Sequence, residues 1–116
     1  QPFIVVNADI WTNYLFIDLN EKLFDQSLAH IILVDNPPQH DGDFSLNKQS
    51  IVSGKDFTFS GIGIYKPELF KLHSQKELGE ILKIEKNITG ELYKGLWEDV
   101  GTPERLDQIR KSLSNN

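Results

Sequence analysis

The sequence predicts an α/β fold, and three observations support this class. Apolar, β-branched runs of strand length occur at residues 3–8 and 30–34, and residues 88–92 also read as a strand. Short segments with apolar residues at helical spacing lie between them, and prolines and glycines mark the boundaries. The chain has 116 residues, which is enough for one compact domain and too few for two.

The first third of the chain contains two apolar runs. Residues 3–8 form a continuous β-branched run, which is typical of a buried parallel strand. Apolar residues at positions 16, 19, 23 and 24 then predict one or two short helical turns. Residues 30–34 predict a second strand, which ends before Pro37 and Pro38 because proline has no N–H for strand pairing.

The middle of the chain predicts a hairpin followed by a further strand. Residues 44–46 and 51–52 have the composition of two short arms around a polar turn at 47–49. Residues 57–65 then form an apolar strand that contains Gly61 and Gly63, and these glycines permit close approach of other groups to the backbone.

The last third of the chain predicts alternating helices and strands. Pro67 suits the first turn of a short helix, and Thr102 with Pro103 suits the cap and first turn of a final one. The expected order is a helix at 67–72, a helix around 78–82, strands at 88–92 and 96–100, and a helix that begins after residue 102.

Composition and charge exclude several classes of function. The net charge of −5 argues against nonspecific nucleic-acid binding, which depends on neutralising phosphates. No apolar run approaches the roughly 20 residues of a membrane helix, and the absence of cysteine fits the reducing cytoplasm. The chain also lacks methionine and opens directly on a strand, which indicates a piece of a longer protein.

Two carboxylates are the leading candidates for chemistry. Asp9 follows the first apolar run, and ligands in open α/β sheets bind at the carboxyl ends of strands. Asp99 lies between Trp97 and Val100, just before a predicted helix. Each carboxylate suits Mg²⁺, but each also suits a turn or a helix cap. The local pattern leaves both interpretations open.

Two glycine-containing segments are weaker candidates. Gly42 can bring a backbone N–H close to a ligand and Asp43 can accept from sugar hydroxyls, although the pair also suits a plain turn. The segment Ser60-Gly61-Ile62-Gly63 lacks the spacing of a dinucleotide-binding loop, so packing or ligand contact remain its possible roles. The three histidines have no metal-ligand spacing, and His30 suits a structural role.

A set of ordered motifs points to a known family. It begins with Phe3-Ile4-Val5-Val6-Asn7-Ala8-Asp9 and ends with Trp97-Glu98-Asp99-Val100-Gly101-Thr102-Pro103. Between them lie Val34-Asp35-Asn36-Pro37-Pro38, Gly42-Asp43-Phe44, Phe59-Ser60-Gly61-Ile62 and Tyr65-Lys66-Pro67. The set spans nearly the whole chain and resembles the carboxy-terminal half of the sugar-1-phosphate nucleotidyltransferases.

The resemblance implies a Rossmann-like mixed sheet flanked by helices. It also implies a bacterial, cytoplasmic transferase of sugar-nucleotide synthesis and cell-wall recycling, which joins UTP or GTP to a sugar 1-phosphate and releases pyrophosphate. Asp9 and Asp99 would take the two Mg²⁺-ligand positions. Asn7, Gly42, Asp43, Ser60 and Glu98 would contact the substrate or its surroundings.

The sequence also departs from the family. The glycine-rich triphosphate loop of the amino-terminal half has no match, and Ala8 stands where a glycine is usual. Residues 1–116 are therefore expected to be the carboxy-terminal part of one nucleotidyltransferase domain without its nucleotide-binding part, and inactive alone. The alternative is a noncatalytic sugar-nucleotide-binding or regulatory module. An incomplete sheet predicts self-association through exposed strand edges.

Overall fold

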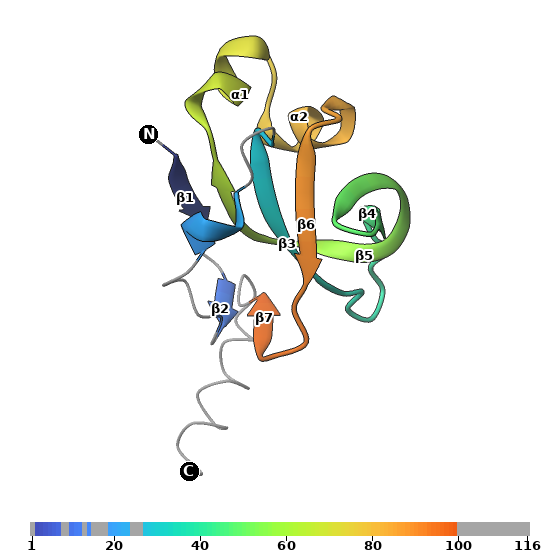
Figure 1. Cartoon of the computed structure of the whole chain (residues 1–116). Helices are drawn as coiled ribbons and strands as arrows, with labels where there is room; N and C mark the ends of the chain where they lie inside the picture. Colours follow the sequence, from blue (N-terminus) through green and yellow to red (C-terminus); the bar gives the residue numbers. More distant parts are fainter. Residues whose placement is uncertain (1, 8–9, 13, 15–18, 24–26, 100–116) are drawn as a thin grey trace.

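The computed structural model describes residues 2–7, 10–12, 14, 19–23 and 27–99 (Figure 1). The elements follow the chain as β1 (Phe3–Val6), β2 (Ile10–Thr12), the 3-10 turn η1 (Leu19–Lys22), β3 (Ala29–Asp35), β4 (Phe44–Asn47), β5 (Ser50–Tyr65), α1 (Pro67–Leu72), α2 (Leu78–Ile84), β6 (Ile88–Leu92) and β7 (Trp97–Asp99). The predicted helix after residue 102 lies outside the described residues.

The main sheet is mixed, and its strands lie in the order β1-β5-β3-β6. Strand β5 is antiparallel to both β1 and β3, whereas β3 and β6 are parallel. In Figure 1, α1 and α2 lie at one end of this sheet, and the two-stranded sheet β2–β7 lies at the other end. The predicted α/β fold with a mixed sheet and helices is confirmed.

Strand β5 is longer than its sequence predicts. The arm expected at 51–52 and the strand expected at 57–65 are one element of 16 residues. Its pairing with β4 shifts, because Phe44 lies opposite Phe57 whereas Ser45 lies opposite Val52. Residues 53–56 are therefore an outward excursion of a continuous strand. Their polar composition resembles a loop, which explains why the sequence predicts two segments.

Hydrophobic cores lie on both faces of the sheet. On one face, Leu69 of α1 and Ile81 of α2 pack against Ile31 of β3. On the other face, Tyr14 and Leu19 pack against the described side chains Ile32, Ile62 and Ile64. Strand β3 is buried along Ala29–Val34, as its continuous apolar run predicts. Both faces therefore hold β3 in place, and its carboxyl end is fixed.

Strand β1 corrects one sequence expectation. The run at residues 3–8 predicts a buried parallel strand, but β1 pairs antiparallel with β5 and is largely exposed. Phe3, Ile4 and Val6 are 41%, 43% and 41% exposed. A β-branched run indicates a strand, but burial depends on neighbours that the run cannot specify.

No described helix is long and apolar enough to cross a membrane.

Candidate functional site

The carboxyl ends of the parallel strands β3 and β6 meet at one edge of the sheet. The backbone N–H of Tyr93 donates to the carbonyl of Leu33 at 2.8 Å, which continues the pairing beyond β6. A pocket of about 220 Å³ lies at this edge, between residues 34–38 and residues 93–97. Its wall includes an exposed ion pair between Lys94 and Asp35, whose Nζ and Oδ2 lie 2.8 Å apart.

The β2–β7 pair brings the two leading motifs together. Ile10 lies opposite Asp99, Trp11 opposite Glu98, and Thr12 opposite Trp97. The residue that follows Asp9 in the chain is thus the strand partner of Asp99. Asp9 itself lies outside the described residues, and only the backbone of Glu98 and Asp99 is described. The convergence of the two carboxylates therefore stays a prediction. The described residues contain no group of three or more potential metal ligands.

One hydrogen bond fastens this small sheet to β5, and a second joins its two strands at their open end. The Trp97 indole Nε1–H donates to the carbonyl of Ser60 at 2.9 Å, and the Thr12 hydroxyl donates to the carbonyl of Leu96 at 2.6 Å. Ser60 is 1% exposed, and its hydroxyl accepts from the N–H of Ile62 at 3.1 Å. Ser60 therefore supports β7 from within the sheet, and its predicted contact with substrate is untested.

Asn7 lies directly over Gly61. Its N–H donates to the Gly61 carbonyl at 3.1 Å. A Cβ added to Gly61 would lie 2.7 Å from Nδ2 of Asn7, and the φ of Gly61 is +88°. Only glycine readily accommodates both the close approach of Asn7 and a positive φ. The close approach that the sequence predicts at Gly61 is confirmed, and it positions the exposed Asn7 at the end of β1.

The Gly42–Asp43 loop is anchored by backbone contacts. Gly42 has a φ of +95°, and a Cβ there would lie 2.2 Å from the carbonyl oxygen of Lys55. The Asp43 carboxylate accepts from the N–H of Phe59 at 2.9 Å, and the backbone N–H of Asp43 donates to the carbonyl of Phe57 at 2.7 Å. One carboxylate oxygen of Asp43 thus stabilises the hairpin. The other has no described protein donor and is available to a ligand.

A polar network supports the same loop from behind. The Thr58 hydroxyl donates to Oδ1 of Asn36 at 2.7 Å and lies 3.0 Å from Nδ1 of His40. Nδ1 of His40 also accepts from the N–H of Gly42 at 3.0 Å, and Nδ2 of Asn36 donates to the carbonyl of Lys55 at 2.9 Å. His40 is therefore a structural support of the loop that the family resemblance implies to lie beside the sugar.

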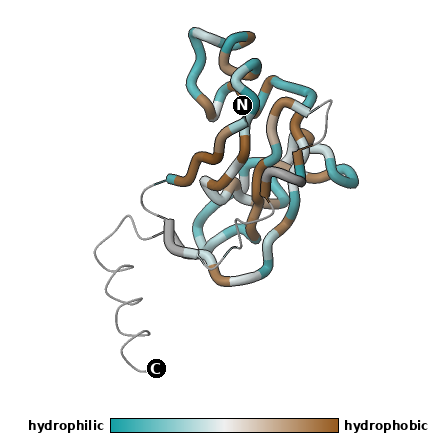
Figure 2. The backbone as a smooth tube through the Cα atoms, turned by 60° about the vertical axis from the view of Figure 1, so that its left-hand side comes forward, coloured by the Kyte–Doolittle hydropathy of each residue, from teal (hydrophilic) through white to brown (hydrophobic). Residues whose placement is uncertain are grey.

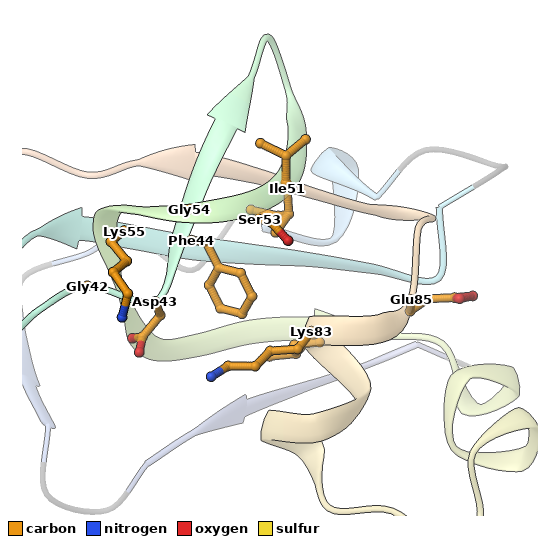
Figure 3. Close-up of a pocket in the computed structure, with 11 residues that line it drawn as sticks. Gly42, Asp43, Phe44, Ile51, Ser53, Gly54, Lys55, Lys83 and Glu85 are labelled. Carbon is orange, nitrogen blue, oxygen red and sulfur yellow. The ribbon is translucent and has the colours of Figure 1, made fainter.

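Gly42 and Asp43 line a second pocket, of about 240 Å³ (Figure 3). It lies between the β4–β5 hairpin and the carboxyl end of α2, so it is distinct from the pocket beside Trp97. Lys55 and Lys83 also line it. Sequence reasoning did not select these lysines, because nothing in their local pattern distinguishes them from solvated surface residues.

Glu91 is the centre of a network that sequence reasoning missed. Its Oε1 accepts from Lys22 at 2.7 Å and from Tyr14 at 2.9 Å, and lies 3.1 Å from Nε2 of the buried His30. Nδ1 of His30 lies 2.8 Å from the Thr89 hydroxyl. The hydrogen bond from His30 is the largest cause that lowers the pKa of Glu91 to about 2. The structural role expected of His30 is consistent with these contacts.

Comparison with known proteins shows what this arrangement resembles. The chain is 41% identical to N-acetylmuramate alpha-1-phosphate uridylyltransferase of Neisseria meningitidis serogroup B, over 95% of the chain and 54% of that protein. It thus spans about half the length of the curated relative. No protein-family model matches it.

Solved structures share its fold. The HddC protein of Yersinia pseudotuberculosis superposes with a TM-score of 0.74 at 21% identity, and 97% of the chain covers 55% of that protein. A Bacillus anthracis protein described as a glucose-1-phosphate thymidylyltransferase, in complex with sucrose, superposes with a TM-score of 0.71 at 17% identity. Here 96% of the chain covers 54% of that protein. The 41% identity to the uridylyltransferase confirms the resemblance predicted from the motifs: the chain is similar to about half of a sugar-1-phosphate nucleotidyltransferase.

Proposed function

We propose that the chain is the carboxy-terminal part of an enzyme that transfers a nucleotidyl group to a sugar 1-phosphate. One phosphate oxygen of the sugar 1-phosphate attacks the α-phosphorus of the nucleoside triphosphate. The bond from this phosphorus to the bridging oxygen breaks, and pyrophosphate leaves. The observation that carries the proposal is the register of β2 with β7, since it brings Asp99 opposite the neighbour of Asp9.

The residues at this edge suit a divalent metal ion. Carboxylate oxygens are the ligands that Mg²⁺ prefers, and it is commonly held by one or two of them together with substrate phosphates. Asp9 and Asp99 would hold the ion, and Glu98 would lie beside them. When bound, Mg²⁺ supplies positive charge that neutralises the phosphates. The roles of the chain's own residues are to orient the two substrates and to position these carboxylates.

The sugar would lie between this edge and the Gly42–Asp43 loop. The free carboxylate oxygen of Asp43 is suited to accept from a sugar hydroxyl, because its other oxygen is already fixed by Phe59. Asn7 would contact the sugar or its phosphate from β1. The name of the curated relative supports UTP and N-acetylmuramate 1-phosphate as substrates, which would place the enzyme in the cytoplasm and in cell-wall recycling.

The test is an assay of the full-length protein for pyrophosphate release from UTP and N-acetylmuramate 1-phosphate. We expect turnover that requires Mg²⁺, and we expect Asp99→Asn to lower kcat by about 100-fold or more, since electrostatic stabilisation of this kind has that magnitude. Asp56→Asn makes the same chemical change at an exposed position of β5 and should retain activity. Full activity of Asp99→Asn would contradict the metal assignment. Absence of turnover would favour a noncatalytic binding module.

A further inference from the structure

The pocket between the β4–β5 hairpin and α2 has an apolar floor and a charged rim. Phe44, Ile51 and Leu82 line it and are 4%, 8% and 2% exposed. Its volume of about 240 Å³ is smaller than the roughly 300–1,000 Å³ of a site that encloses a whole drug-sized ligand. The pocket therefore suits one substituent of a larger molecule better than a complete nucleotide sugar.

Two lysines on different elements contribute to the rim. Lys55 belongs to the excursion of β5, and Lys83 belongs to the last turn of α2. Figure 3 shows both side chains at the same end of the pocket as Asp43, with the ring of Phe44 beside them. Neither ammonium group has a carboxylate within 4.0 Å among the described residues, as the ion pairs of that part of the chain involve other groups.

The carboxylates of this pocket have other partners. Asp43 accepts from the N–H of Phe59, and Glu85 lies at the opposite end of the pocket in Figure 3, where its Oε2 is 3.8 Å from Nε2 of His73. Lys83 alone would be explained by its position in the last turn of a helix, where a cation is favourable. Lys55 has no such explanation, because it lies in the excursion of β5 and not at a helix terminus.

We propose that Lys55 and Lys83 bind a carboxylate substituent of an acidic sugar 1-phosphate and thereby determine sugar specificity. The inference rests on the proposed function, because it assumes that the sugar lies beside the Gly42–Asp43 loop. From there a substituent reaches the pocket across Phe44, so its apolar atoms contact the ring while its carboxylate lies between the two lysines. A neutral sugar has no carboxylate to pair with the two lysines, so they stay solvated and add nothing to its binding affinity.

The test compares two sugars in the full-length protein. N-acetylmuramate 1-phosphate carries a lactyl carboxylate, and N-acetylglucosamine 1-phosphate is the same sugar without it. The measured quantity is the ratio of kcat/KM for the acidic sugar to that for the neutral sugar. We expect a ratio well above one. We also expect Lys55→Gln and Lys83→Gln each to lower it by about fivefold through KM, as an exposed ion pair of about 1 kcal/mol implies.

Controls separate this inference from the proposed function. Lys71→Gln removes the same charge from the exposed end of α1 and should leave the ratio unchanged. Thermal unfolding of each variant verifies that it folds. Turnover of both sugars with a ratio that neither pocket lysine alters would overturn the carboxylate assignment and leave the transferase proposal standing. If the full-length protein turned over neither of the two sugars, both the carboxylate assignment and the transferase proposal would be overturned.

Discussion

Glu91 connects three parts of the chain that are remote in sequence. It lies on β6, and it accepts hydrogen bonds from Lys22 of η1 and from Tyr14, which precedes that turn. His30 on β3 completes the set. Three donors on one carboxylate favour its charged form strongly, since each hydrogen bond is made to the anion. The network therefore holds Tyr14 and Lys22 against the sheet face that carries Ile32.

The lowered pKa of Glu91 predicts a loss of stability in acid. A carboxylate whose folded pKa is below its unfolded value stabilises the fold above the unfolded pKa. This contribution is lost as the pH falls through the folded pKa, here from about 4.5 to about 2. We expect this contribution to be about 1–2 kcal/mol, because partial exposure screens the charge.

The measurement is the free energy of urea unfolding at several pH values between 6 and 2, for the wild-type chain and for Glu91→Gln. The difference between them should shrink as the pH falls through this window, because glutamine cannot titrate. Other carboxylates change the free energy of unfolding of both proteins equally, so their contributions cancel in the difference. A difference that stays constant over the whole range would show that Glu91 does not carry the effect.

At the scale of elements, local patterns predict most of the described fold. Strand β3, strand β6, the β4–β5 turn and helix α1 agree with their sequence signals, since each is a run of one periodicity bounded by proline, aspartate or a polar turn. The exposure of β1 and the continuity of β5 were not predictable in this way. Both depend on neighbouring strands and not on the residues of the element itself.

The candidate site was less predictable for the same reason. Pairing of Ile10 with Asp99 joins segments from the two ends of the chain, and only the resemblance to a family indicated it. The Glu91 network spans sequence separations of 61 to 77 residues, so no local pattern reveals it. Spacing within a motif predicts a local turn or cap, whereas a network of this kind is specified only by the tertiary fold.

Asp43 provides a test of how the β4–β5 hairpin is held. Its carboxylate binds the N–H of Phe59 close to the point where the strand register shifts. Asp43→Ala leaves this N–H without its side-chain partner and should destabilise the chain by about 1–3 kcal/mol, whereas Asp43→Asn keeps an oxygen acceptor and should cost less than about 1 kcal/mol. Urea unfolding of the two variants measures the difference. Equal losses of unfolding free energy in Asp43→Ala and Asp43→Asn would show that this hydrogen bond does not hold the hairpin.

At the scale of the whole molecule, the centre of the sheet is covered more completely than its β1 edge. Strand β3 is buried on both faces, while β1 is an edge strand with one described partner, β5. Phe3 is partly covered, because its ring stacks on Phe70 of α1 at a centroid distance of 5.6 Å. Figure 2 shows that hydrophobic residues nevertheless run the length of β1 along one side of the molecule.

An exposed apolar edge strand is a template for pairing with another chain. We therefore expect the isolated chain to self-associate through β1, where Ile4 and Val6 are 43% and 41% exposed. Ile4→Lys and Val6→Lys should reduce association, because a lysine on an edge strand opposes pairing. Leu72→Lys removes an apolar side chain that is 65% exposed but belongs to helix α1 and not to the edge strand, so it should leave association unchanged. Sedimentation velocity over a range of concentrations distinguishes these outcomes, and a wild-type chain that stays monomeric at high concentration would contradict the role assigned to β1.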